Sequence, residues 1–149
     1  MLLGVVFTDT RTEAEVAAMD WTLEVVVVPV TDVDRAKAFY TEKLGFNVDV
    51  DTTVGDAFRV VQLTPPGSGC SITIGPLVVD HVPESSARYQ LCVLDIERAR
   101  AQLVDRGVDV GEITSFSGGG AYDRFIFLTD PDGNNWAVQE VPATRPALP

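Results

Sequence analysis

The sequence predicts an α+β fold in which two βαβββ modules form a curved mixed-sheet cup with helices on its outer face. The main observation is a repeat, because the stretch from Val30 to Ala38 recurs from Val93 to Ala101 with five identities in nine positions. Each copy ends an apolar run, supplies an aspartate suited to cap a helix, and continues into an Ala/Arg/Lys-rich segment. The second observation is that three strand-like segments follow each helix. Together they indicate a duplicated module.

The first module covers about residues 21–80. Residues 21–30 are β-branched and apolar, which is typical of a buried strand. A helix is expected over residues 33–44, because apolar side chains recur on one face and Gly45 suits its C-terminal end. Three further strands are predicted, over residues 46–51, 57–64 and 70–75, with a Pro/Gly turn before the last.

The second module covers about residues 87–141. It opens with a strand over residues 88–93 and a helix over 96–106 that Gly107 closes. The remaining strands are predicted over residues 108–113, 125–129 and 135–141. Three consecutive glycines make residues 115–121 a predicted mobile loop. Residues 1–20 read as an N-terminal extension of this single domain, and residues 142–149 as a flexible tail.

Composition narrows the classes of partner. The chain has 149 residues and a formal net charge of −11, which argues against binding to nucleic acid or an anionic membrane. Its two cysteines make no disulfide framework, so a reducing, cytoplasmic setting is expected. The apolar start is too short for a membrane span and lacks the basic residues of a signal peptide.

Two groups of residues carry a resemblance to a known family. Val30-x-Asp32 is followed by Phe39-Tyr40 and Leu44-Gly45-Phe46, and the second module ends with the turn Asp130-Pro131-Asp132-Gly133-Asn134. With the duplicated βαβββ order, the chain from Trp21 to Val141 resembles the vicinal oxygen chelate superfamily of glyoxalases, bleomycin-resistance proteins and extradiol dioxygenases. The resemblance implies a cup-shaped cleft, which metal-dependent members use to hold a divalent ion with four inward side chains.

The places of those four ligands hold Val25, Thr73, Arg88 and Ala137 in this sequence. None is a credible ligand, because Val and Ala have no donor atom, Arg stays protonated and a lone Thr hydroxyl binds a divalent ion poorly. Glu24 and Glu140 lie near two of these places but have the opposite strand parity. His81, the single histidine, is expected to be a solvated loop residue. We therefore predict no metal and no cofactor.

Strand alternation assigns side chains to the inner face. Arg88 stands seven residues before Asp95, as Val25 stands before Asp32, and Arg88, Gln90 and Cys92 share one parity. An arginine facing a cavity either recognises an anionic or hydrogen-bonding ligand group, or forms an internal salt bridge or rim contact, and the sequence leaves both readings open. Cys92 reads as a small inward hydrophobe rather than a nucleophile.

The predicted ligand-binding residues share this inner face or, for Tyr122, a lid position after the glycine loop. They are Arg88, Val25, Val27, Thr73, Gln90, Cys92, Tyr122, Ala137 and Gln139. Trp21, Leu23 and Asn135 have the same parity, which gives an apolar wall on the first module with neutral polar groups opposite. The core positions, on the helix side, are Phe39, Tyr40, Trp136 and Val138.

The function favoured by these residues is metal-independent binding of a partly apolar small organic molecule, similar to the bleomycin-resistance branch. The resemblance implies a homodimer with sites shared between subunits. Two alternatives stay open: a metal-dependent lyase or oxygenase of the glyoxalase or dioxygenase type with displaced ligands, and a metal-free isomerase-like enzyme in the same cleft. No catalytic residue can be assigned, and turnover cannot be read from the sequence.

Overall fold

The structure is a computed structural model that describes residues 12, 19–56 and 58–143. Most of the predicted extension (1–20) and of the predicted tail (142–149) lies outside the described residues. No helix in the described part of the chain is long and apolar enough to cross a membrane.

Module 1 forms a four-stranded mixed sheet with one helix above it. Its elements are β1 (Val25–Val27), α2 (Val33–Ala38), which continues as the π-helical turn η1 (Phe39–Lys43), then β2 (Asn47–Val54), β3 (Phe58–Thr64) and β4 (Ser71–Ile74). The strand order is β1-β4-β3-β2, with β1 parallel to β4 and the other pairs antiparallel.

Module 2 repeats this plan. Its elements are β5 (Arg88–Val93), α3 (Ile96–Asp105), β6 (Thr114–Ser115), β7 (Arg124–Thr129) and β8 (Asn135–Glu140). The strand order is β5-β8-β7-β6, with β5 parallel to β8. The two sheets therefore have the same topology, and the predicted fold class with its duplicated βαβββ module is confirmed.

The capping residues of the repeat act as predicted. The Asp32 carboxylate accepts a hydrogen bond of 3.0 Å from the Arg35 backbone N–H, and Asp95 accepts one of 3.0 Å from Arg98. Both caps sit in extended backbone and satisfy a free N–H of the first helical turn. The repeated aspartates thus set where each strand gives way to its helix.

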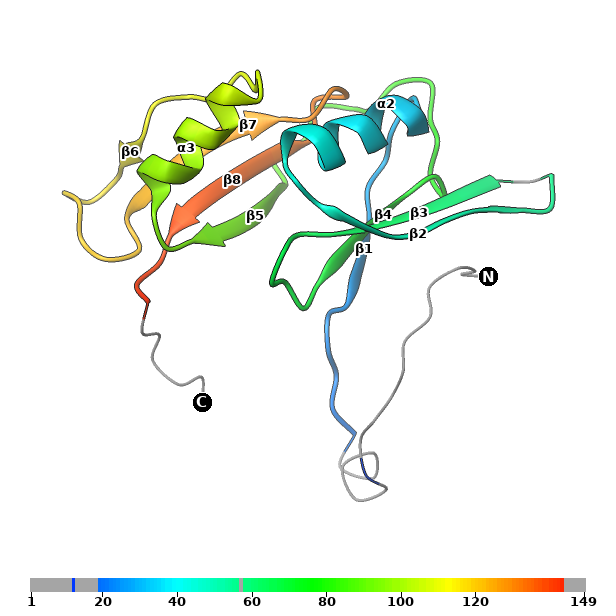
Figure 1. Cartoon of the computed structure of the whole chain (residues 1–149), viewed down its shortest axis with the longest axis horizontal. Coiled ribbons are helices and arrows are strands. Elements are labelled where there is room, and N and C mark those ends of the chain that lie inside the picture. The colour runs from blue at the N-terminus through cyan, green and yellow to red at the C-terminus, as the bar shows by residue number, and fades with distance from the viewer. Residues whose placement is uncertain (1–11, 13–18, 57, 144–149) are drawn as a thin grey trace.

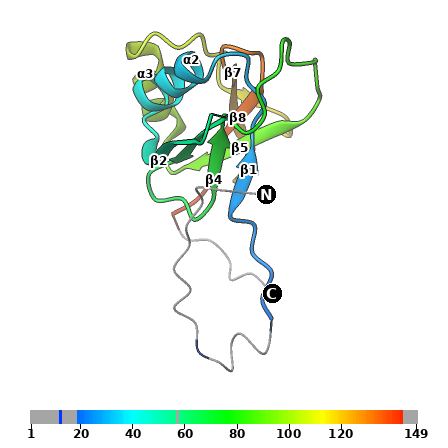
Figure 2. The same ribbon diagram turned by 90° about the vertical axis from the view of Figure 1, so that its right-hand side faces the viewer.

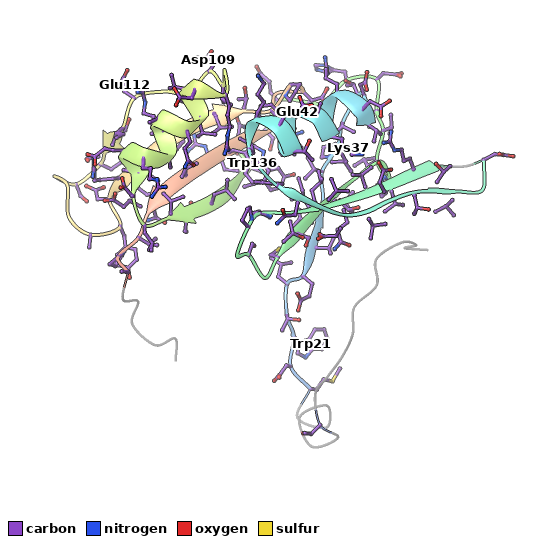
Figure 3. The ribbon with its side chains drawn as sticks, in the orientation of Figure 1. Trp21, Lys37, Glu42, Asp109, Glu112 and Trp136 are labelled. Carbon is purple, nitrogen blue, oxygen red and sulfur yellow. The ribbon has the colours of Figure 1, made fainter. Side chains whose placement is uncertain are left out.

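Two strand predictions need correction. The first strand was expected over residues 21–30, but β1 spans Val25–Val27 only, with one isolated bridge from Val30 to Val78. Trp21 and Leu23 are 86% and 76% exposed on an extended segment that leaves the sheet, and Figure 3 shows Trp21 well away from both modules. They are not part of an inner wall within one chain.

The strand predicted over residues 108–113 is wrong. The Val108 N–H bonds back to Leu103 O at the end of α3, and the Arg100 side chain takes the Gly111 carbonyl at 2.9 Å. The Gly111 N–H still donates to Phe127 O of β7 at 3.1 Å, but the Val108 N–H and the Gly111 carbonyl are not available to a ladder, so regular pairing with β7 begins only at Thr114.

The modules meet on the helix side of their sheets. Tyr40 is fully buried there, its hydroxyl donates to Asp130 Oδ2 at 2.6 Å, and Trp136 Nε1 donates to that hydroxyl at 3.0 Å. Burial and the Asp130 carboxylate raise the pKa of Tyr40 above its usual range. The predicted core roles of Tyr40, Trp136 and Val138 are confirmed, and Phe39 packs against the same core partly buried.

The Asp130–Asn134 turn joins the two modules. Asp132 accepts hydrogen bonds from the Thr31 backbone N–H at 3.2 Å and from the Arg35 guanidinium at 2.8 Å, and Asn134 Nδ2 donates to Pro29 O at 2.9 Å. The end of one module's β7–β8 hairpin is thus fixed to the strand–helix junction of the other. Both helices lie on one side as a result, and the opposite faces of the two sheets are turned the same way (Figures 1 and 2).

Candidate functional site

The module-2 face is the side of β5, β8 and β7 turned away from α3. Strand register places Arg88 beside Asn135, Gln90 beside Ala137 and Cys92 beside Gln139. On β7, Phe125 stands beside Gln139 and Phe127 beside Ala137. Arg88, Gln90 and Cys92 are exposed on this face, as their parity predicted, while Ala137 is 2% exposed at its centre.

Arg88 lies over an aromatic ring rather than against a carboxylate. Its guanidinium carbon is 4.7 Å from the centroid of the Phe127 ring, and it forms no ion pair with any residue in the described part of the chain. A cavity of about 300 Å³ opens beside it, bordered also by Asp109, Thr129 and Asn135. The cation therefore keeps most of its hydrogen-bonding capacity for a group that enters the cavity.

Three phenylalanines extend this surface. Phe125 and Phe127 are stacked with ring centroids 6.2 Å apart, and Phe116 meets them edge-on at 5.6 and 6.2 Å. Phe116 is 68% exposed, although it belongs to the cluster. Such an open aromatic surface suits the flat apolar body of a small molecule.

One carboxylate holds the glycine loop at the edge of this cluster. Asp123 accepts hydrogen bonds from the backbone N–H groups of Phe116, Ser117 and Gly119 at 2.8–2.9 Å. The hydrogen bonds from the Gly119, Phe116 and Ser117 N–H groups lower the pKa of Asp123. The carboxylate therefore stays ionised and continues to accept these bonds from the loop. Ser115 ends β6, and residues 116–121 form the predicted loop, whose mobility stays a prediction. Asp123 positions Phe116 beside β7.

The neutral polar side chains of the face are linked in a row. Gln90 Nε2 donates to Gln139 Oε1 at 2.7 Å, and Gln139 Nε2 donates to the carbonyl of Tyr122 at 2.7 Å. Tyr122 has a φ of 66°, an uncommon conformation for a non-glycine residue, and is 40% exposed. The predicted lid role of Tyr122 stays a prediction.

The module-1 face is the corresponding side of β1, β4, β3 and β2. Register places Val25 beside Ser71, Val27 beside Thr73, and Thr73 beside Gln62. The apolar wall predicted here is interrupted, because β4 and β3 contribute polar side chains to the centre of the face, between β1 and the apolar Val60 of β3. Ser71, Thr73 and Gln62 are all buried.

The predicted ligand-binding residues therefore fall into two sets. Val25, Val27 and Thr73 lie on the module-1 face, and the other six lie on or beside the module-2 face. The contacts described above between the modules run through Tyr40, Asp130 and Trp136 on the helix side and through the turn that carries Asp132 and Asn134. A single cleft lined by both sets stays a prediction.

The four family ligand places do not fit a metal ion. Val25, Thr73, Arg88 and Ala137 are spread over both faces, and among them only the Thr73 hydroxyl has a lone pair to offer an ion. No group of three or more His, Cys, Asp or Glu side chains gathers in the described part of the chain. The Glu140 side chain lies on the helix side of the sheet, where it accepts a hydrogen bond from the Ile96 backbone N–H at 3.0 Å. His81 is exposed.

Comparison with known proteins assigns the fold to a family. The sequence model of the Glyoxalase/Bleomycin resistance protein/Dioxygenase superfamily matches residues 22–138. The chain belongs to this superfamily. An uncharacterised protein of Bacillus subtilis (strain 168), YetH, is 28% identical over 117 residues, which cover 77% of this chain and 94% of that protein.

Solved structures of similar proteins have the same fold. TnmS3, an antibiotic-binding protein from Streptomyces sp. CB03234, is 29% identical with a TM-score of 0.64, covering 82% of this chain and 97% of its own. A superfamily member from Sphaerobacter thermophilus DSM 20745 is 26% identical with a TM-score of 0.66, covering 81% and 98%.

Sequence reasoning missed the aromatic part of the site in this superfamily member. Phe125 and Phe127 alternate with the buried Ile126 and Leu128, and this period-two pattern would have placed both rings on the inner face. Phe116 and Asp109 gave no comparable signal, because both lie outside regular strands. The fold alone brings Asp109 to the cavity and Phe116 to the rings of Phe125 and Phe127.

Proposed function

We propose that this protein binds a small organic molecule on the module-2 face, with its flat apolar body against the phenylalanine cluster and an anionic or accepting group at Arg88. The observation that carries the proposal is the Arg88 guanidinium, held over Phe127 beside a cavity without a carboxylate partner among the described residues. A cation placed so keeps free donors that a ligand carboxylate or carbonyl satisfies. The likeness to an antibiotic-binding protein supports the same class of function.

Binding is proposed to need no metal ion. Valine, threonine, arginine and alanine at the four family places supply no ligand set, and Arg88 adds a positive charge where a divalent cation would sit. This favours a binding protein over a metal-dependent glyoxalase or dioxygenase. A metal-free enzyme on the same face differs from it only by turnover.

A second copy of the chain is proposed to complete the cleft. Within one chain the two faces lie side by side rather than opposed, and the segment leading into β1 exposes Met19, Trp21 and Leu23 by 63%, 86% and 76%. These three apolar side chains lie within five residues of one another and form an exposed apolar segment. Sedimentation equilibrium checks this: we expect a dimer that Trp21→Ser weakens, and a monomer at micromolar concentration would contradict it.

The binding proposal is tested with naphthalene-2-carboxylate as the probe, by isothermal titration calorimetry. A charge-assisted hydrogen bond contributes about 1.5–3 kcal/mol, so Arg88→Ala should weaken binding about 10- to 150-fold. Arg88→Lys should recover part of the loss, because it keeps the charge without the planar fork. Phe127→Leu should also weaken binding, since it removes the ring on which the guanidinium rests.

The matched control is Arg98→Ala, which removes the same charge from an exposed position on α3. We expect it to change probe affinity less than about twofold, as distant exposed charges are screened. Equal losses in Arg88→Ala and Arg98→Ala would show that only net charge matters, and would refute the anchor role.

A further inference from the structure

The module-1 face carries a polar network that the proposed function does not use. Thr64 Oγ1 donates to the Asp49 carboxylate and lies 2.6 Å from Ser71 Oγ. Gln62 Nε2 approaches the same carboxylate at 3.5 Å. Strand register explains why Asp49 takes part, because the β2–β3 pairing shifts between Val48 and Val50. A bulge of this kind re-aims one side chain, and here it accompanies the turning of Asp49 toward Gln62 and Thr64.

The Gln62 side chain contains an acceptor without a donor. Gln62 is 7% exposed, and its Oε1 is the one buried side-chain N or O atom in the described part of the chain that has no hydrogen-bond partner. Burying an unpaired carbonyl is costly, so its retention in the middle of a sheet needs a reason. Its amide nitrogen is directed at Asp49, which fixes Oε1 as the free end.

The hydroxyl protons of the network are already committed. Thr64 gives its one proton to Asp49, so Ser71 must be the donor in the Thr64–Ser71 contact. Thr73 gives its proton to Val61 O at 3.2 Å. Besides the second N–H of the Gln62 amide, these side chains therefore still offer lone pairs, on the Asp49 carboxylate, Gln62 Oε1, Ser71 and Thr73.

We propose that the module-1 face is a second binding subsite, selective for a hydrogen-bond donor group and above all for an organic ammonium. A group with several N–H donors meets several acceptors on this face, whereas a carboxylate or carbonyl meets only the second N–H of the Gln62 amide. Asp49 is exposed and marks the entrance, and the apolar Val25 and Val27 on β1 border the subsite. A small turn of the Gln62 side chain brings Oε1 to the incoming donor.

The selectivity is opposite to that of the Arg88 site. One face offers a cation and aromatic rings, and the other offers acceptors and one carboxylate. The inference does not depend on the proposed function, because the two subsites lie on different sheets and share no residue. It predicts that one aromatic body binds at different places according to the sign of its polar group.

The test uses naphthalen-2-ylmethylammonium as the probe, in parallel with naphthalene-2-carboxylate. We expect the ammonium to shift the backbone amide NMR signals of Gln62, Thr64 and Thr73, and the carboxylate to shift those of Arg88 and Phe127. Gln62→Met, which is close in size and has no acceptor, should weaken ammonium binding at least about 10-fold and leave carboxylate binding unchanged. It should not lower the thermal midpoint, because it removes an unpaired buried carbonyl.

Asp49→Asn should weaken ammonium binding similarly, and Asp56→Asn, the same charge change in the exposed β2–β3 turn, is its control. The inference is overturned if the ammonium does not bind at millimolar concentration, if Gln62→Met leaves its affinity unchanged, or if Asp56→Asn weakens it as much as Asp49→Asn. If the wild-type protein does not bind naphthalene-2-carboxylate, the Arg88 proposal is refuted and the inference about the module-1 face is not.

Discussion

Replacing Tyr40 with Phe tests how the two modules are held together. The substitution keeps the ring and leaves almost no cavity, but removes the hydroxyl that donates to Asp130 and accepts from Trp136. The Asp130 oxygen keeps a second donor, Asn134 Nδ2 at 2.8 Å, whereas the Trp136 indole N–H loses its acceptor in the core. A lost charge-assisted hydrogen bond and a newly unpaired donor together cost about 2–4 kcal/mol.

This loss is a large share of the about 5–15 kcal/mol that stabilises a typical domain. Urea unfolding followed by far-UV circular dichroism measures it, with an unchanged m-value expected. The control is Tyr122→Phe, which removes a hydroxyl from a 40% exposed side chain and should cost under about 0.5 kcal/mol.

A double-mutant cycle separates the hydrogen bonds from packing. In a Trp136→Phe background the indole donor is already absent, so Tyr40→Phe should cost at least about 1 kcal/mol less than in wild type. A cost below about 1 kcal/mol in wild type, or the same cost in both backgrounds, would refute the view that this network locks the modules.

Three further predictions concern the caps, the metal and pH. Asp32→Ala and Asp95→Ala should each cost about 0.5–2 kcal/mol of stability in thermal unfolding and leave probe affinity nearly unchanged; a large affinity loss with stability intact would contradict the capping role. Elemental analysis after dialysis against zinc, nickel and iron should find no stoichiometric ion, and a tightly retained one would disprove metal independence. Hydrogen bonds from Arg59 and Lys37 lower the pKa of Asp51, so its contribution is present above the unfolded pKa of about 3.9 and is lost as pH falls through the lower folded value. Because these ion pairs are partly exposed, Asp51→Asn should cost under about 1 kcal/mol at pH 7 and flatten the fall in stability between pH 4 and pH 2; an unaltered pH profile would argue against the pairing.

The local signals in the sequence were sufficient for most of the fold. The repeated aspartate caps and the glycines that end each helix act within a few residues, so their roles follow directly from residue type. The strands that failed depended on partners. Residues 108–113 have strand character, but Arg100 binds the Gly111 carbonyl and the end of α3 binds the Val108 N–H, while the Gly111 N–H makes one bond to β7. Trp21 and Leu23 continue the alternation of β1, yet have no sheet to join within one chain.

The candidate site was predicted only as far as strand parity reaches. Parity placed Arg88, Gln90 and Cys92 on one face, and register confirms it. It did not show what Arg88 meets, because Phe127 comes from a strand whose register against β8 is a tertiary property. The unpaired Gln62 carbonyl could not be predicted from the sequence either. It depends on which side chains donate and which accept in a hydrogen-bond network that spans three strands.

The most direct test of the proposed function is a crystal structure of the protein with naphthalene-2-carboxylate. The proposal predicts the naphthalene ring against Phe127 and the carboxylate within hydrogen-bonding distance of the Arg88 guanidinium, with no metal ion beside it. A probe bound away from Arg88, or a carboxylate held by a metal ion, would contradict it.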